Sequence, residues 1–236
     1  TAIGQNALFE NETGIENVAV GYRACEDSTD RNYNVMIGSL AGLNGGAHNN
    51  TGVGYKAMGS ATKTTAADDN TAVGALALRS LTTGSDNVAL GYNSLTDNST
   101  GAFNTAVGAN ALNALTTASA ITALGYEAGN GHTTGANCIY LGREAGRANR
   151  TANGIMCIGQ DAGRNNTASD VTFIGQGAGY NNTSGGFNVG VGGGTYGSTQ
   201  GALGSCTTGS NNTALGSAAA LSLTTGIYNT AVGRRA

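Results

Sequence analysis

The sequence predicts an all-β fold, a parallel β-solenoid of about 14 coils with 17 residues per coil. Three observations lead to this prediction. A tetrapeptide that ends in Gly recurs along the whole chain, and nine of its thirteen spacings are 17 residues. The 236 residues include 40 Gly and no Pro. The apolar residues are mostly Ala and Val, which are too small to fill the core of an ordinary globular domain of this length.

The tetrapeptide predicts one strand in each coil, because alternation is the period of a strand and not of a helix. It ends at the following residues: Gly4, Gly21, Gly38, Gly54, Gly74, Gly91, Gly108, Gly125, Gly142, Gly159, Gly175, Gly192, Gly216 and Gly233. A helical-hairpin repeat needs about 33 residues or more, so this period is too short for one. We expect a second strand in the Ala-containing stretch after each Gly, and two turns to complete the coil.

Stacked coils would pair each strand in parallel with the same strand of the next coil, which satisfies the backbone donors and acceptors. A Pro in such a strand would remove a ladder hydrogen bond, so the absence of Pro agrees with this arrangement. Thr-Gly pairs such as Thr83-Gly84 and Thr100-Gly101 mark the closing turns. We expect their Gly to supply the positive φ of a tight turn.

The period continues through residues 1–236, which we therefore expect to form a single solenoid domain. Two longer steps indicate local insertions, near residues 61–69 and 193–206. Coils 122–188 read Ala-Gly after the tetrapeptide, as at Ala128-Gly129 and Ala145-Gly146, where most others read Ala-Leu or a close variant. We expect a variant cross-section in these coils.

The third residue of the tetrapeptide is always Val, Ile or Leu, so we expect the first and third residues to face the interior. The residue before the tetrapeptide is usually Asn, and stacked Asn side chains hydrogen-bond along a column. We expect a structural Asn ladder, with a ligand-binding row of amides as the alternative. Its members are Asn17, Asn34, Asn50, Asn70, Asn87, Asn104, Asn188, Asn212 and Asn229.

Four consecutive coils replace this Asn by an apolar residue. If the Asn face is exterior, these coils present an apolar strip, and such a strip usually marks an interface. The alternative is a local twist that places the strip inside. The candidate interface residues are Ile121, Cys138, Tyr140, Ile155, Cys157, Val171 and Phe173.

Charged residues suggest no general affinity for nucleic acid, since the net charge is −3. One cluster does stand out in adjacent coils: Arg143, Arg147, Arg150 and Arg164 beside a column of Glu127, Glu144 and Asp161. We interpret it as a solvated ion-pair patch, with a divalent-cation site or an anionic-glycan site as alternatives. The chain contains no run of about 18 apolar residues, so the sequence predicts no membrane span.

Residues that would carry chemistry are few. His48 and His132 are isolated in turn-like stretches, and no Ser-His-Asp or Cys-His set can be assembled from their spacing. We therefore expect no catalysis, no cofactor and no metal. The four cysteines are expected to be thiols that are either reduced or bridged between subunits: Cys25, Cys138, Cys157 and Cys206.

Four tyrosines directly follow the Gly of a tetrapeptide and are expected along one edge of the solenoid. They are Tyr22, Tyr55, Tyr92 and Tyr126. We expect surface or interface packing for them, with contact to a glycan or partner as the alternative.

The string N-[TV]-A-[VI]-G-x-x-A, as in Asn70-Thr-Ala-Val-Gly and Asn104-Thr-Ala-Val-Gly, resembles the head repeats of trimeric autotransporter adhesins. It is still more similar to the 17-residue repeats of phage tail fibres and related large surface proteins, and the resemblance covers essentially the whole chain. Resemblance to the adhesin heads implies a left-handed parallel β-roll that trimerises outside the cell and binds host matrix. The chain departs from the adhesin pattern in its longer period and its two insertions.

The expected function is a structural fibre or adhesin shaft, exposed on a cell or virion surface, without catalysis. One alternative is an extracellular filament subunit that stacks end to end. The other is a glycan- or ice-binding solenoid module. The expected partners are copies of the chain itself, as a homotrimer or an end-to-end stack, and a surface glycan or host receptor. Nucleic acid and membrane insertion are not expected.

Overall fold

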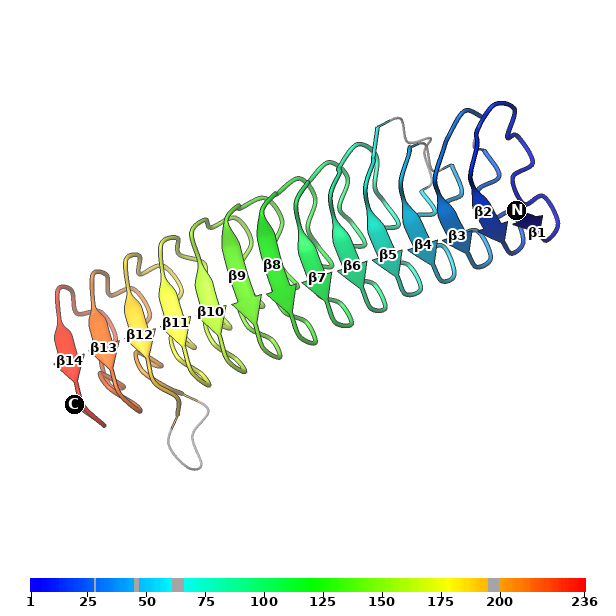
Figure 1. Ribbon diagram of the computed structural model, residues 1–236. Coiled ribbons are helices and arrows are strands. Elements are labelled where there is room, and N and C mark those ends of the chain that lie inside the picture. Colours follow the sequence, from blue (N-terminus) through cyan, green and yellow to red (C-terminus); the bar gives the residue numbers. More distant parts are fainter. Residues whose placement is uncertain (28, 45–46, 61–65, 195–199) are drawn as a thin grey trace. The chain divides into compact units, whose positions relative to one another are not determined.

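The computed structural model describes residues 1–27, 29–44, 47–60, 66–194 and 200–236. In these ranges the regular secondary structure is entirely β, in fourteen short strands, and no helix occurs (Figure 1). The chain forms two compact units, Thr1–Ala120 and Ile121–Ala236, and each is described by itself. Residues 61–65 and 195–199, within the expected insertions, lie outside the described residues.

Unit 1, Thr1–Ala120, contains seven strands, one per coil. Neighbouring strands pair in parallel and in register, as Val18 with Val35 and Val88 with Thr105 show. The strands are β1 (Ala2–Ile3), β2 (Val18–Val20), β3 (Val35–Ile37), β4 (Thr51–Val53), β5 (Thr71–Val73), β6 (Val88–Leu90) and β7 (Thr105–Val107).

Unit 2, Ile121–Ala236, repeats this plan with seven more strands. Cys157 pairs with Tyr140 on one side and with Phe173 on the other, so equivalent residues form columns. The strands are β8 (Ile121–Leu124), β9 (Cys138–Leu141), β10 (Met156–Ile158), β11 (Thr172–Ile174), β12 (Val189–Val191), β13 (Thr213–Leu215) and β14 (Thr230–Val232).

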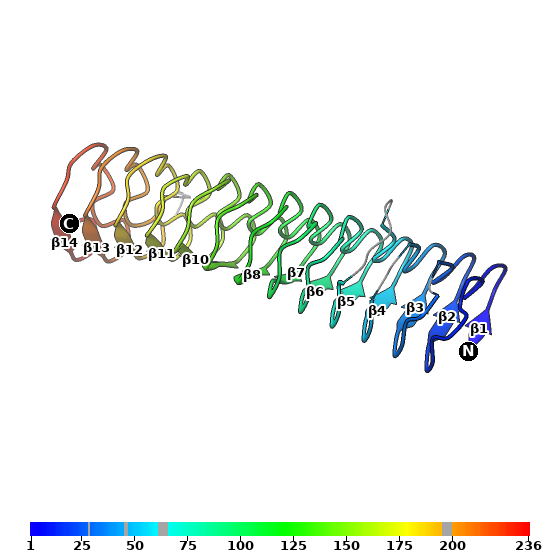
Figure 2. The same ribbon diagram turned by 90° about the horizontal axis from the view of Figure 1, so that it is seen from above.

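Both units confirm the prediction of a parallel β-solenoid with one strand in each tetrapeptide. In Figure 1 the strands lie at the front and point downward, while successive strands advance toward the left. Figure 2, seen from above, places the return segments of the coils behind the strands. Within each unit the coils are therefore left-handed.

The stretch after each tetrapeptide is not the second strand that the sequence predicts. Its second and fourth residues have positive φ, for example 64° at Leu76 and 49° at Leu78. Leu76 N donates to Tyr55 O of the preceding coil (2.9 Å), and Leu78 N donates to Ser94 O of the following coil (3.1 Å). The alternating backbone thus sends hydrogen bonds to both neighbouring coils without forming a strand.

The glycines have different roles from those expected. The Gly that ends the tetrapeptide has the positive φ, 136° at Gly21, and a Cβ there would lie 2.5 Å from Gly38 O. The Gly of the Thr-Gly turns does not: Gly84 and Gly101 are not among the residues with positive φ. A Cβ on Gly101 would instead collide with Ala118 O of the next coil. The turn glycine therefore permits close approach of coils and does not provide a left-handed conformation.

The interior lies on the opposite side of the strand from the one predicted. Ala89, the middle residue of β6, is fully buried, whereas Leu90 is 46% exposed. The reason is the narrowness of the coil. A buried Ala three residues after the Gly, such as Ala77, lies in the same interior, so the strand contributes a small residue and the β-branched residues point outward. The same position holds a buried Ala in most coils: Ala24, Ala41, Ala57, Ala77, Ala111, Ala128, Ala145, Ala162 and Ala178.

Candidate functional site

The apolar strip that the sequence predicts as an interface is inside unit 2. Tyr140 and Phe173 have no exposed surface. The remaining members are at most 2% exposed: Ile121, Cys138, Ile155, Cys157 and Val171. The interface prediction is wrong because the Asn-bearing face of the strand is the interior face, and the alternative of an internal strip holds.

Large interior residues on the strand are accommodated by Gly elsewhere in the coil. A Cβ on Gly179 would lie 2.5 Å from ring atoms of Phe173, and one on Gly146 would collide with the Tyr140 ring. In most coils of unit 1 the pattern is reversed, since a small residue in the strand such as Ala89 accompanies a larger buried residue such as Leu95. The exception is Met36 with Gly42. A large side chain in the middle of the strand is thus accompanied by a small residue at the fourth position after the tetrapeptide Gly, and the reverse also holds. This exchange explains the Ala-Gly reading in the coils of Tyr140, Cys157 and Phe173, whereas the coil of Ala123 and Gly129 is small at both positions.

The predicted Asn ladder is confirmed as an interior column of hydrogen bonds. Asn34 N donates to Asn17 Oδ1 (3.0 Å) and Asn50 N donates to Asn34 Oδ1 (2.9 Å). In unit 2, Asn212 N and Nδ2 both donate to Asn188 Oδ1 (2.9 and 3.2 Å). Buried amides that satisfy the neighbouring coil in this way fix the register of stacking. Other bonds of this kind link Asn50 to Asn70, Asn70 to Asn87, Asn87 to Asn104 and Asn212 to Asn229.

The ladder amides also serve the carbonyls of the closing turns. Asn70 Nδ2 donates to Gly84 O (3.1 Å), and Asn87 Nδ2 donates to Gly101 O (2.9 Å). Both carbonyls lie 14 residues further along the chain, in the next closing turn. An interior carbonyl without a donor costs about 1–3 kcal/mol, so each turn requires such a group.

A second interior column, which sequence reasoning missed, provides the donor where the ladder is apolar. Ile121 has no donor to offer, and Gly135 O is bonded by His132 Nε2 at 2.6 Å, only three residues away. The same replacement occurs in the coils that carry Ile155 and Val171. In the first, Asn166 Nδ2 donates to Ala168 O (2.8 Å), and in the second, Asn182 Nδ2 donates to Gly185 O (2.8 Å). The signal was present in the sequence as a polar residue two or three positions before the turn carbonyl.

His132 is part of a buried polar cluster in unit 2. Because Gly135 O only accepts, Nε2 carries the proton, and Nδ1 accepts from Tyr140 Oη (3.1 Å). Asn149 Nδ2 donates to the same Tyr140 oxygen (2.8 Å). Burial lowers the pKa of His132 below its usual value of 6.5 and raises that of Tyr140 well above 10. The cluster is therefore neutral and its hydrogen bonds satisfy one another.

Arg143, Arg147 and Arg164 form the ion-pair network that the sequence predicts, and among the described residues Arg150 makes no ion pair in it. Arg147 bonds Glu127 (2.8 Å) and Glu144 (3.4 Å), while Arg164 bonds Glu144 (2.6 Å) and Asp161 (3.5 Å). Glu144 and Asp161 are buried beneath these side chains, so the patch is less solvated than expected. Among the described residues no group of three or more His, Cys, Asp or Glu is placed to hold a metal ion.

The cysteines are interior thiols. All four are buried, and none forms a disulfide in the chain. Burial raises the pKa of Cys138, Cys157 and Cys206, which keeps the thiols protonated and unreactive. Their burial excludes the expected alternative of bridges between subunits in the folded chain. In the described ranges, no helix has the length and apolar character needed to cross a membrane.

A regular column of apolar residues lies on the outward face of the strands. Its members are the third tetrapeptide residues, which were expected inside. In unit 1 they are Ile3, Val20, Ile37, Val53, Val73, Leu90 and Val107, and in unit 2 Leu124, Leu141, Ile158, Ile174, Val191, Leu215 and Val232. All are exposed or half-exposed. We call this set the outward apolar column of each unit.

Comparison with protein-family models, curated proteins and solved structures finds no match for this chain.

Proposed function

We propose that this chain is a structural β-solenoid shaft that associates laterally with copies of itself, as a homotrimer, in a fibre or adhesin outside a cell or virion. No catalytic step is part of this function. The observation that carries the proposal is the outward apolar column.

The column is regular in both units and contains no charged residue. In unit 1, Ile37 is 40% and Leu90 46% exposed, and in unit 2 Leu124 is 51% exposed. Apolar residues repeated at every coil make a continuous apolar surface, which soluble monomers rarely leave exposed. A second copy that presents the same column would cover it with matching spacing, because both copies repeat at the coil distance of about 4.8 Å.

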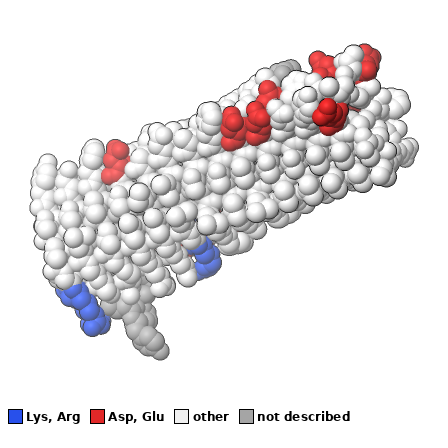
Figure 3. All heavy atoms as spheres, viewed as in Figure 1, with Lys and Arg blue, Asp and Glu red and all other residues white. Residues whose placement is uncertain are grey.

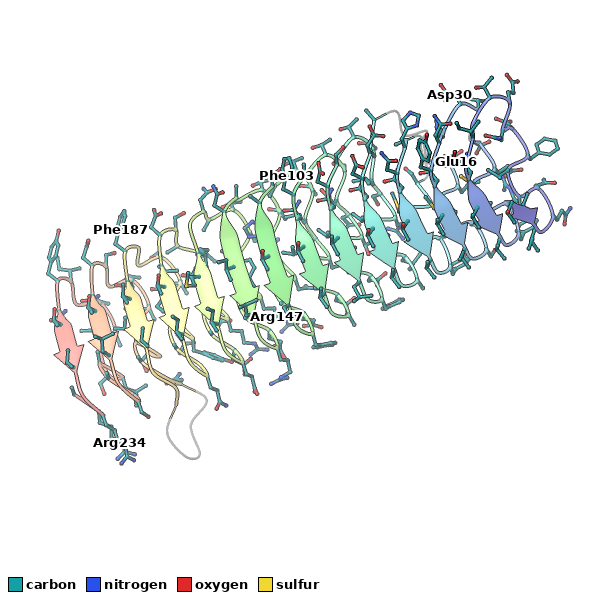
Figure 4. The ribbon with its side chains drawn as sticks, in the orientation of Figure 1. Glu16, Asp30, Phe103, Arg147, Phe187 and Arg234 are labelled. Carbon is teal, nitrogen blue, oxygen red and sulfur yellow. The ribbon has the colours of Figure 1, made fainter. Side chains whose placement is uncertain are left out.

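The charged residues that the figures show lie at the edges of the strands, beside the outward apolar column of each unit. Glu16, Asp69 and Asp86 are exposed at the edge where the strands of unit 1 begin. Figure 3 shows acidic residues along this edge, and basic residues along the edge where the strands of unit 2 end. In Figure 4, Glu16 lies at the first edge, and Arg147 and Arg234 at the second.

The extracellular location and the fibre role rest on the resemblance of the N-[TV]-A-[VI]-G-x-x-A string to surface-protein repeats. In the described residues the narrow interior is filled by packed apolar side chains and hydrogen-bonded amides, which supports a role without catalysis. A shaft needs only a long, regular, self-stabilised stack of coils.

Analytical ultracentrifugation tests lateral association. Val73→Glu with Leu90→Glu places two charges on adjacent coils of the outward apolar column without altering the interior. We expect the wild-type chain to sediment as an oligomer and this variant as a monomer. Thr83→Glu, at an exposed turn of the same unit, is the matched control and should sediment like wild type.

A wild-type chain that is monomeric at high concentration would contradict the proposal. An oligomer of unchanged size in the double variant, with circular dichroism like that of wild type, would show that another surface mediates association. Negative-stain images of the wild type separate lateral oligomers from filaments that grow end to end.

A further inference from the structure

Three tyrosines of unit 1 form a row in which every second coil carries an aromatic ring. Tyr22, Tyr55 and Tyr92 each occupy the position directly after the tetrapeptide Gly. They are 49%, 50% and 53% exposed. The same position in the coils between them holds the smaller, half-buried Ser39 and Ala75. Each Tyr side chain is therefore larger and more exposed than the residues at the same position in the adjacent coils.

Backbone hydrogen bonds align the row along the solenoid. Leu40 N donates to Tyr22 O (2.8 Å), and Lys56 N donates to Ser39 O (3.0 Å). The backbone oxygens of Tyr55, Ala75 and Tyr92 accept the equivalent bond from the next coil, so this position is in register through the unit. Successive rings are two coils apart, which is about 9.6 Å at the spacing of paired strands.

This interval selects a particular kind of polymer. In an extended β-1,4-linked glycan, successive sugars are turned by half a rotation, so every second sugar presents the same face to a surface. Two such sugars have nearly the length of two coils. The face of an aromatic ring is electronegative and attracts the C–H groups on a sugar face. Rings on every coil would contact one another, whereas rings on alternate coils leave space for this contact.

The surroundings of the row fit a neutral glycan. Described coils of unit 1 have no charged residue at this position: it is occupied by Gln5, Tyr22, Ser39, Tyr55, Ala75, Tyr92 and Ala109. The residues that follow the three tyrosines are Arg23, Lys56 and Asn93, and all carry hydrogen-bonding groups. Arg23 is ion-paired with Glu26, and Lys56 Nζ lies over the Tyr55 ring, 5.5 Å from its centre. A polysaccharide hydroxyl can accept from the ammonium and bond to the amide.

We infer that the row of Tyr22, Tyr55 and Tyr92 is a binding platform for a linear, neutral β-1,4-linked glycan that lies along the solenoid axis. The platform belongs to a single copy of the chain and does not depend on lateral association. From Tyr22 to Tyr92 the row extends over four coil steps, about 19 Å, so a chain of about five sugars is the shortest that reaches all three rings.

Retention on microcrystalline cellulose and on chitin, with amylose as the α-linked control, tests the platform. We expect retention on one or both β-1,4 polymers and none on amylose. In calorimetric titrations, cellohexaose should bind more tightly than cellobiose. Each single Tyr→Ala change in the row should weaken cellohexaose binding about three- to tenfold, the range expected for one aromatic contact. Tyr33→Ala, an equally exposed ring outside the row, should have no effect.

A spacing variant separates the platform from general aromatic stickiness. Ser39→Tyr with Tyr55→Ser keeps three rings and moves the middle one by a single coil, which breaks the two-coil interval. We expect it to bind cellohexaose as weakly as Tyr55→Ala. Unchanged binding in this folded variant would overturn the inference, as would a folded wild-type chain that is retained on neither β-1,4 polymer or equally on amylose.

Sedimentation of the same samples distinguishes this inference from the proposed function. Loss of the oligomer with unchanged glycan binding in the triple Tyr→Ala variant would assign the rings to packing between copies and overturn the platform. A monomeric wild type that binds cellohexaose would support the platform and contradict lateral association.

Discussion

At the scale of single residues, the interior of each coil is built around the carbonyl oxygen of its closing turn. Gly84 O accepts a hydrogen bond from Asn70 Nδ2, which lies 14 residues earlier in the chain. Gly185 O receives one from Asn182, three residues away in the same coil. The donor therefore has two possible positions. Gly101 O accepts from both, Asn87 and Asn98, whereas the coils with an apolar ladder residue use the second position. This relation makes the break in the Asn ladder a substitution of one donor for another.

Moving the donor between these positions should be possible by mutation. Asn70→Val removes the bond to Gly84 O and the acceptor for Asn87 N, and we expect a loss of about 2–4 kcal/mol in the free energy of unfolding. Leu81→Asn in the same background introduces an amide at the position equivalent to Asn182. Urea denaturation should show that the double variant is more stable than Asn70→Val alone. Equal or lower stability of the double variant would contradict the exchange.

The buried His132 should make stability depend on pH. Its pKa in the folded state is lowered by burial, and the groups that face it, Tyr140 and Asn149, are neutral. The unfolded chain then binds a proton more readily than the folded one. Its contribution is fully present above about pH 6.5 and is lost as the pH falls toward the folded pKa. Thermal unfolding of wild type should shift to lower temperature between pH 7 and pH 5.

His132→Asn is the matched variant for this effect, since Asn occupies the equivalent place in the coils of Asn149, Asn166 and Asn182. We expect it to fold and to lose most of the decrease between pH 7 and pH 5. His48, in unit 1, is present in both proteins, so the comparison isolates the change at His132. An unchanged pH dependence in the variant would exclude His132 as its source.

At the scale of the element, the sequence predicted where each strand lies but not which of its faces is buried. The tetrapeptides coincide with the strands because their period and Gly spacing are local properties. The inward face depends on what lies opposite in the coil. Val and Ile are the more hydrophobic residues of the tetrapeptide, but they point outward because the strand alternation that buries Asn70 also buries Ala72. The candidate interface was misplaced for this reason, whereas the Asn ladder was predicted correctly because its bonds follow the stacking direction.

Volume exchange within the coil gives a test of this packing. Ala89→Met adds a large side chain opposite Leu95 and should cost about 1–3 kcal/mol of unfolding free energy. Leu95→Gly leaves a cavity and should cost about 2–5 kcal/mol. The combination reproduces the pairing of Met36 with Gly42 in the same unit, where a Cβ on the Gly would lie 2.8 Å from the Met side chain.

We expect the combined variant to be clearly more stable than the sum of the two single losses predicts, as chemical denaturation would measure. Additive losses would show that the two positions do not share space. Thr105→Met, at an outward position of β7, is the control for adding Met without burying it, and its effect should be small.

At the scale of the whole molecule, the continuous 17-residue period led us to expect a single domain, while the chain forms two compact units with a boundary between Ala120 and Ile121. That boundary falls where the Asn ladder changes to Ile121 and where the variant coils begin. In a stack of repeats, stability is close to a sum of the stabilities of the repeats and of their contacts with neighbours. A weakened coil should therefore affect its own surroundings first.

Hydrogen exchange of the Asn70→Val variant can decide how far cooperativity extends. Asn70 stacks between Asn50 and Asn87 in unit 1, and its loss should raise the exchange of backbone amides in β4, β5 and β6. Amides of β9 to β11, in unit 2, should keep their wild-type protection because their ladder and turn donors are intact. Faster exchange by the same factor in both units would mean that the chain unfolds as the single domain predicted by its period. Exchange confined to unit 1 would show that the change of interior donors at Ile121 also separates two cooperative units.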